Sequence, residues 1–236
     1  MKYMTKKWYQ DMQNGTLLPH GLQVDSKAEH YSDTYYRKLY AQKKAQWLAM
    51  RLEFVNDWGE PFNRNEETRW FFQIYQQQKR RLLSELPQEI LLQIADIRVF
   101  ALGCCSESVY AQAKAFVEQS CASYRRTMEA YVAYEESELQ DVAFASESFH
   151  DGDVISLRRK GNNLCMAFDD EFEGLRYHRL IFKDAVVIKQ DRRLSGAYWL
   201  YHEVYKIADG YEVHVLLWNK SGLIDFIVQC SDIVMK

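Results

Sequence analysis

Residues 198–230 read YWLYHEVYKIADGYEVHVLLWNKSGLIDFIVQC, and this stretch decides the fold. Apolar and polar side chains alternate through it with a period of two, which is typical of half-buried β-strands. Asp209-Gly210 separates two of the alternating runs, and this dipeptide is a strong signal for a two-residue hairpin turn. The turn predicts three cross-strand pairs: Ala208 with Tyr211, Val204 with Val215, and Glu203 with Leu216. The following loop, residues 219–222, predicts two more: Trp218 with Leu223, and Leu216 with Asp225.

These pairings assign the side chains to two faces of the predicted sheet. One face is almost purely apolar and is expected to form the core: Leu200, Val204, Tyr211, Val213, Val215, Leu217, Ile224, Phe226 and Val228. The other face mixes carboxylates, one imidazole and amphipathic rings: Trp199, Tyr201, Glu203, Tyr205, Glu212, His214, Leu216, Trp218 and Asp225. A register slip of one residue would exchange the faces. The mixed face is expected to contact solvent, pack on another part of the chain, or line a cleft.

The period of two begins near residue 149, whereas helical spacing dominates before about residue 140. Strand-like runs cover residues 153–159, 163–168, 176–183, 186–189, 198–207, 211–218 and 223–230. Tight turns and no helices separate them, which predicts an antiparallel meander of six or seven strands. We therefore expect an α+β fold, in which an N-terminal helical bundle (residues 1–148) packs on a C-terminal antiparallel β-sheet meander (residues 149–236).

Several helix boundaries in the N-terminal half follow from local signals. Thr5 and Ser106 are expected to cap helix starts. A long helix is expected to begin at Ser26, and Trp58-Gly59-Glu60-Pro61 is expected to end it, because glycine and proline interrupt helices.

The segment 88–102 is predicted to be a buried helix, because its residues are apolar nearly all round. Asp96 and Arg98 lie inside it, two residues apart, so they would not face each other on a helix. Buried charges need partners. Each is therefore expected either to form a structural ion pair with another segment or to anchor a ligand.

The composition indicates a soluble globular protein. The 236 residues carry a net charge of −3, so we expect no nucleic-acid partner. No apolar run is long enough to span a membrane, and no signal peptide follows Met1. Five cysteines at irregular spacing favour free thiols in a reducing cytoplasm.

Three groups of residues have both a chemical and a structural interpretation. Glu203, His214 and Asp225 fit a general acid/base set or a metal site, and they also fit an ordinary solvated sheet face. Cys104-Cys105 precede a helix start, where a thiol pKa is lowered, although cysteine is more usually a small buried hydrophobe. The acidic residues 169–173 have the charge to attract Ca²⁺, but they lack the alternating pattern of a calcium loop and are typical of a solvated turn. No phosphate loop, nucleophile elbow or metal-spaced Cys/His pair is present, so neither cofactor nor metal is expected.

The opening residues 2–13, KYMTKKWYQDMQ, and the central residues 96–103, DIRVFALG, resemble a bacterial family catalogued as a domain of unknown function. The resemblance extends over most of the chain. It implies a bacterial, cytosolic protein and transfers no catalytic residue. The pattern of residues 201–205, 223–226 and 232–233 is similar to that of some immunity proteins that neutralise bacterial toxins, which implies binding without catalysis.

We therefore expect a non-catalytic binding protein whose partner, a protein or a small ligand, meets the mixed face of the sheet. Aromatic side chains on such a face can anchor an interface. The candidate binding residues are Trp199, Tyr201, Glu203, Tyr205, His214, Trp218 and Asp225, together with Asp96 and Arg98. Two alternatives remain open: a hydrolase-like enzyme that uses Glu203, His214 and Asp225, and a homo-oligomer that buries the same face.

Overall fold

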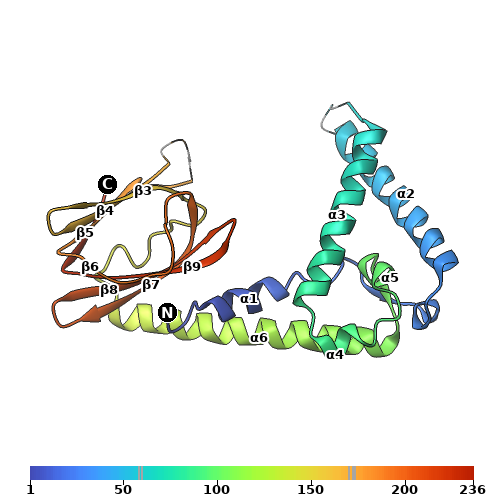
Figure 1. The fold of residues 1–236 in the computed structure, drawn as a ribbon, viewed down its shortest axis with the longest axis horizontal. Helices are drawn as coiled ribbons and strands as arrows, with labels where there is room; N and C mark the ends of the chain where they lie inside the picture. The colour runs from blue at the N-terminus through green and yellow to red at the C-terminus, as the bar shows by residue number, and fades with distance from the viewer. Residues whose placement is uncertain (58, 60, 170, 172–173) are drawn as a thin grey trace. The chain divides into compact units, whose positions relative to one another are not determined.

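The computed structural model describes residues 1–57, 59, 61–169, 171 and 174–236. Helices occupy the N-terminal half and an eight-stranded antiparallel sheet occupies the C-terminal half (Figure 1), which confirms the α+β prediction. Contacts divide the chain into two compact units. We call Asp11–Ala122 the helical unit, and Met1–Gln10 together with Ser123–Lys236 the β unit. The sequence-based division after residue 148 marks the change from helices to strands, whereas the contacts group the first ten residues and the end of the last helix with the strands.

Two helices contribute residues to both units: α1 (Lys6–Asn14) and α6 (Glu107–Glu138). The other elements of the helical unit are β1 (Gln23–Val24), the 3₁₀ helix η1 (Ser26–Glu29), α2 (Asp33–Asp57), α3 (Arg64–Glu85), α4 (Gln88–Leu91), α5 (Ile97–Ala101) and β2 (Cys104–Cys105). β1 and β2 pair in parallel. Among the described residues, none of the helices is long and apolar enough to cross a membrane.

Local capping explains most helix starts. The hydroxyl groups of Thr5 and Ser106 accept the backbone N–H groups of Trp8 and Val109, as predicted. The helix expected from Ser26 instead consists of η1 and then α2, because the backbone of His30 is extended between them. The predicted stop at residues 58–61 includes Trp58 and Glu60, which lie outside the described residues.

The prediction of one buried helix over residues 88–102 is wrong. Two short helices, α4 and α5, occupy this segment, and Asp96 is the N-cap of α5. The Asp96 carboxylate accepts the backbone N–H of Arg98 at 2.9 Å. Aspartate competes for helix backbone groups in this way and so favours caps over helix interiors. The apolar side chains of the segment are nevertheless buried, among them Ile90, Val99 and Phe100.

The large sheet of the β unit has the strand order β10-β5-β4-β3-β7-β8-β9-β6. Its strands are β3 (Asp153–Lys160), β4 (Asn163–Phe168), β5 (Arg179–Lys183), β6 (Val186–Gln190), β7 (Ala197–Ile207), β8 (Gly210–Asn219), β9 (Gly222–Cys230) and β10 (Asp232–Met235). Consecutive strands pair in β3–β4–β5 and β7–β8–β9, as a meander requires. β6 instead pairs with β9, and β10 pairs with β5. The sheet therefore has eight strands, where six or seven were predicted, and two of its pairings are not those of a simple meander.

The sheet curls around one apolar core. Side chains from both strand groups belong to a single buried cluster, for example Phe168 and Phe182 from β4 and β5, and Val215 and Phe226 from β8 and β9. In Figure 1 the β3–β5 strands accordingly lie opposite the β7–β9 strands.

The β7–β8 hairpin turns one residue earlier than predicted, with the same loop length. Ile207 pairs with Gly210, so Val204 faces Val213 and Glu203 faces His214. Both partners on β8 lie two positions earlier than expected, and a shift of two residues leaves the faces unchanged. Gly210 has φ +132°, and a Cβ atom there would lie 2.2 Å from the carbonyl oxygen of Cys230, so glycine is required. The predicted β8–β9 pairs, Trp218 with Leu223 and Leu216 with Asp225, are confirmed.

A β-bulge between Trp199 and Tyr201 exchanges the predicted faces at the start of β7. An extra residue in one strand reverses the alternation of the side chains that precede it. Trp199 is therefore fully buried in the core, and the prediction that it lies on the mixed face is wrong. Tyr198 takes a position directly opposite Trp218, and each of these two residues is 41 % exposed.

Candidate functional site

The N-terminal segment of the β unit covers much of the mixed face predicted from the sequence. Met4 and Trp8 are buried. The indole of Trp8 packs edge-on against Tyr201, with ring centroids 4.9 Å apart. The ammonium group of Lys2 lies 4.5 Å from the ring centroid of Tyr205. Two of the predicted binding aromatics, Tyr201 and Tyr205, therefore contact residues of the chain itself.

Glu203 holds this segment in place. Its side chain is fully buried, and its oxygens accept the backbone N–H groups of Lys2 at 2.9 Å, Tyr3 at 3.0 Å and Met4. The hydroxyl group of Tyr205 donates to the same carboxylate. Buried carboxylates require such partners, because an uncompensated charge in the interior is costly. The contacts make Glu203 an anchor for the N-terminal backbone.

The structure places His214 directly opposite Glu203 and Asp225 opposite Leu216, but the three side chains bond to different partners. His214 is buried, and its Nε2 lies 2.6 Å from Glu212. This hydrogen bond lowers the pKa of Glu212. Asp225 forms ion pairs at the surface with Lys189 and Lys6. Within the described residues, no group of three or more His, Cys, Asp or Glu side chains is placed to hold a metal ion.

Asp96 and Arg98 pair with each other, so the expectation that they would not face each other is wrong. The guanidinium donates to both Asp96 oxygens, and its Nη1 donates to Asp33 at 3.1 Å. The capping position of Asp96 allows the contact, since only Arg98 lies within the helix. Arg98 also stacks on Tyr36, with its Cζ atom 4.2 Å from the ring centroid. This cluster ties α5 to the start of α2.

The other candidate groups add little chemistry. Cys104 and Cys105 are buried free thiols in β2, and burial raises the pKa of Cys105 to about 11. A raised pKa disfavours the thiolate that nucleophilic catalysis requires. Asp170, Phe172 and Glu173 of the acidic run lie outside the described residues.

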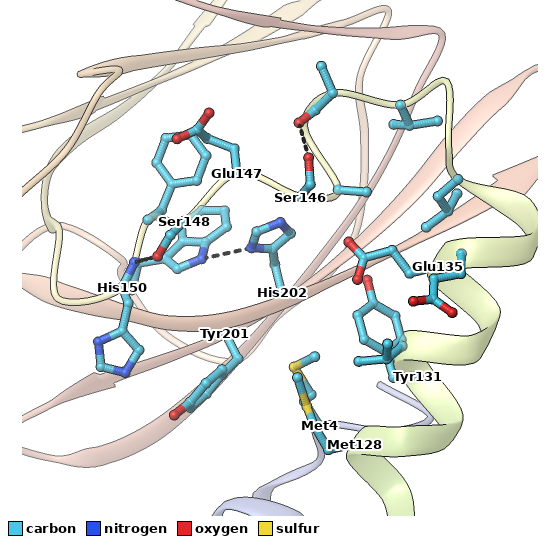
Figure 2. A pocket seen from close by; sticks show the side chains of 18 of the residues that line it. Met4, Met128, Tyr131, Glu135, Ser146, Glu147, Ser148, His150, Tyr201 and His202 are labelled. Atoms are coloured by element: carbon cyan, nitrogen blue, oxygen red, sulfur yellow. Dashed lines mark hydrogen bonds between the residues drawn. The ribbon is translucent and has the colours of Figure 1, made fainter.

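A first pocket of about 540 Å³ lies between the second half of α6, the segment after it and β7 (Figure 2). Two serines and two histidines line it, but they do not form a nucleophile and base. The Ser146 hydroxyl donates to the carbonyl oxygen of Ala143, and the Ser148 hydroxyl accepts the backbone N–H of His150. His202 cannot act as the base, because both of its ring nitrogens form hydrogen bonds with other residues.

His202 is a buried, neutral structural histidine. Its Nδ1 accepts a hydrogen bond from the indole N–H of Trp199 at 3.3 Å, so its Nε2 carries the proton and donates to the carbonyl oxygen of Phe144 at 3.1 Å. Burial lowers the pKa of His202 to about 4. Both ring nitrogens are thus used inside the fold, and the dashed line at His202 in Figure 2 marks one of these hydrogen bonds.

We expect His202 to make stability depend on pH between about 4 and 6.5. The unfolded imidazole titrates near 6.5 and the folded one near 4, so the unfolded state binds more protons in this range. The contribution of His202 to stability is therefore fully present above pH 6.5. It is lost as the pH decreases, and the loss reaches about 3 kcal/mol at pH 4. Urea unfolding at several pH values should show a shallower dependence in His202→Gln. The exposed His150→Gln is the control, and identical pH profiles for wild type and His202→Gln would refute this role.

A second pocket, of about 590 Å³, opens at one end of the sheet, and we call it the Tyr198–Trp218 pocket. Tyr198 lies next to the first residue of β7 and Trp218 next to the last residue of β8, and their rings are stacked with centroids 6.1 Å apart. Three carboxylates share the lining: Asp151, Asp153 and Asp169. Tyr9 and Leu200 are the other described residues that line it.

Backbone pairing brings these carboxylates together. The N–H of Asp151 donates to the carbonyl oxygen of Trp199, and the N–H of Asp169 donates to the carbonyl oxygen of Asp153. Asp151 has φ 65°, a left-handed conformation that aspartate tolerates better than most residues.

The pocket is electronegative. Burial raises the pKa of Tyr9, and the negative charge of Asp151 raises it further. Among the described residues, the buried Oδ1 atom of Asp153 has no hydrogen-bond partner. The arrangement of exposed ring surface beside carboxylates suits a ligand with a positive charge.

Trp218 is the one predicted binding residue that lines this pocket, and the sequence reasoning missed the rest. Tyr198 was missed because the bulge that turns it outward has no signal in the alternating pattern. Asp153 begins β3 and Asp151 lies in the turn before it, and polar residues are ordinary at both places. Their position at the junction of four strands depends on the order of the sheet, which local patterns do not specify.

The chain belongs to a family of proteins of unknown function, DUF4085, whose sequence pattern matches residues 34–221. This confirms the expected membership of a domain-of-unknown-function family. No curated protein and no solved structure matches the chain. Tyr198, Trp218 and the three pocket carboxylates all lie within the matched range.

Proposed function

We propose that this protein is a non-catalytic binding protein, and that its Tyr198–Trp218 pocket holds a small ligand with an organic ammonium group. The observation that carries the proposal is the stacked, half-exposed aromatic pair beside three carboxylates in one pocket. Elsewhere on the mixed face, Tyr201, Glu203 and Tyr205 already contact the N-terminal segment.

The aromatic pair supports the proposal through its exposed surface. Exposed tryptophan and tyrosine rings attract cations over their faces, with about 0.5–2 kcal/mol for each good contact. Tyr198 and Trp218 are cross-strand neighbours on adjacent strands, so the sheet holds their rings in position before a ligand arrives. A preformed site loses less entropy on binding.

The carboxylates support the proposal through charge. A quaternary ammonium group needs no hydrogen-bond acceptor, but it gains from nearby negative charge in a partly desolvated pocket. Asp153 and Asp169 are half-buried, and Asp151 is exposed at the rim. The volume of about 590 Å³ lies in the range of small-molecule sites.

A thermal-shift assay tests the proposal with choline as the probe and dimethylbutanol, its uncharged carbon isostere, as the reference. Choline at millimolar concentration is expected to raise the melting temperature, because a ligand that binds the native state stabilises it. The isostere should give little or no shift. Trp218→Ala and Tyr198→Ala should abolish the effect of choline, and Asp153→Asn should weaken it.

Phe72→Ala is the matched control, since Phe72 is an exposed aromatic residue of the helical unit, 50 % exposed and outside this pocket. It should leave the choline shift unchanged. An equal shift with choline and its isostere, or an undiminished shift in Trp218→Ala, would exclude a cation site at this pair.

We also propose a cytoplasmic location in a bacterium. The five free thiols support a reducing compartment, where disulfides are rare. The likeness of residues 96–103 to a bacterial family supports the origin.

A further inference from the structure

The helical unit contains a separate pocket of about 770 Å³ whose charge is opposite to that of the Tyr198–Trp218 pocket. One face of α2 forms a wall of it. The side chains on this face follow at intervals of three and four residues, so they lie above one another along three turns. They are Tyr35, Lys38, Leu39, Gln42, Lys43 and Gln46. Thr34 of α2, residues of β1, η1 and β2, and the connecting residues Asp25, His30 and Ser32 provide the remaining described lining.

The pocket carries an excess of positive charge. Lys27, Lys38 and Lys43 line it, and among the described lining residues Asp25 alone carries a carboxylate. No acidic residue stands three or four positions from Lys38 or Lys43 in α2, so neither lysine has a helical salt-bridge partner. The three lysines therefore outnumber the single carboxylate by two charges.

The carboxylate of Asp25 accepts hydrogen bonds from the protein itself. Asp25 accepts the backbone N–H of Lys27 at 2.9 Å through one oxygen and the hydroxyl of Tyr35 at 2.6 Å through the other. These hydrogen bonds lower the pKa of Asp25. Because these donors are neutral, the carboxylate keeps its charge, and it offsets one of the three lysine charges around the pocket.

Lys43 is placed against the backbone on the far side of the pocket. Its Nζ atom lies 3.8 Å from the position that a Cβ atom would take on Gly103, next to the buried Cys104. Gly103 has φ +85°, a conformation that favours glycine, and the absence of a side chain keeps this approach open. Lys43 is thus half-buried beside this backbone, while Lys38 is exposed.

We propose that this pocket binds a small metabolite through a phosphoryl group. Lysine ammonium groups bind phosphate as point charges, and the amide groups of Gln42 and Gln46 add neutral donors along the same helix face. The pocket exceeds the size of a phosphate ion and lies within the range of metabolite sites. The site is independent of the proposed ammonium site, because the described residues that line it all belong to the helical unit.

Isothermal titration with glycerol phosphate, inorganic phosphate and glycerol tests the proposal on the full chain. Glycerol phosphate is expected to bind, and its affinity should fall as salt rises, since exposed charges are screened. Binding of inorganic phosphate with equal affinity would show that the ion itself is the ligand and would overturn the metabolite assignment. Glycerol alone should not bind.

The lysine variants locate the site. Lys38→Gln and Lys43→Gln should each weaken the affinity by about tenfold, whereas Lys79→Gln on α3, outside the pocket, should leave it unchanged. Circular dichroism confirms that each variant is folded. Absence of glycerol phosphate binding at millimolar concentration, or unchanged affinity in the Lys38→Gln/Lys43→Gln double variant, would overturn the proposal.

Discussion

Replacing Glu203 with alanine is expected to destabilise the β unit by about 3–5 kcal/mol, because it leaves several hydrogen-bond donors without their acceptor. The substitution leaves the N–H groups of Lys2, Tyr3 and Met4 and the hydroxyl of Tyr205 without their acceptor. Each unsatisfied buried donor costs about 1–3 kcal/mol. The N-terminal segment should then detach and expose Met4 and Trp8, which urea unfolding and hydrogen exchange of the first ten residues would detect.

Asp225→Ala is the matched control for this variant. Asp225 lies on the same face of the sheet, but its partners are the surface ammonium groups of Lys189 and Lys6. Surface ion pairs contribute about 1 kcal/mol or less. Tyr205→Phe removes one of the four donors to Glu203 and should cost an intermediate amount. Equal effects of Glu203→Ala and Asp225→Ala would show that Glu203 is not an anchor.

The second large effect is expected at Arg98. Its guanidinium neutralises Asp96, whose side chain is only 4 % exposed, and it also bonds Asp33 and stacks on Tyr36. Arg98→Ala would leave Asp96 buried and unpaired, at a cost of about 3–5 kcal/mol. Urea unfolding followed by circular dichroism measures the loss. Arg98→Lys should recover only part of it, since lysine lacks the planar fork that binds a carboxylate through two hydrogen bonds.

Arg37 offers a close control, because it pairs with the same Asp33 through a contact one turn along α2. Its side chain is 79 % exposed, so Arg37→Ala should change stability by no more than about 0.5 kcal/mol. If Arg98→Ala and Arg37→Ala cost the same, the cluster around Arg98 contributes no more than a surface ion pair does.

Much of the fold could be predicted from local patterns. The period of two located the strands from β3 to β9, and the Asp209-Gly210 turn located the hairpin, although the strand order that places β6 beside β9 was not visible. Pairing of distant strands depends on the whole core, whereas alternation reports only which side of a strand is buried. The prediction of one helix over residues 88–102 was wrong for a related reason. A run of apolar residues indicates burial, but the cap at Asp96 decides where a helix begins.

The candidate site was harder to predict than the fold. The composition of the mixed face was correct at Tyr201, Glu203 and Tyr205, but the pattern could not show that residues 2–8 would cover them. No periodicity links a segment to a strand two hundred residues away. At the open end of the same face, one bulged residue buried Trp199 and exposed Tyr198.

The most direct test of ligand binding at the Tyr198–Trp218 pocket is a fluorine NMR titration of fluorotryptophan-labelled protein with choline. The loss of one resonance in Trp218→Phe assigns the signal of Trp218, and Trp70, 45 % exposed in the helical unit, provides the internal reference. We expect the Trp218 signal to shift saturably with choline while the Trp70 signal stays fixed, and dimethylbutanol to shift neither. An unmoved Trp218 signal, or an equal response to the uncharged isostere, would contradict a cation site at this pair.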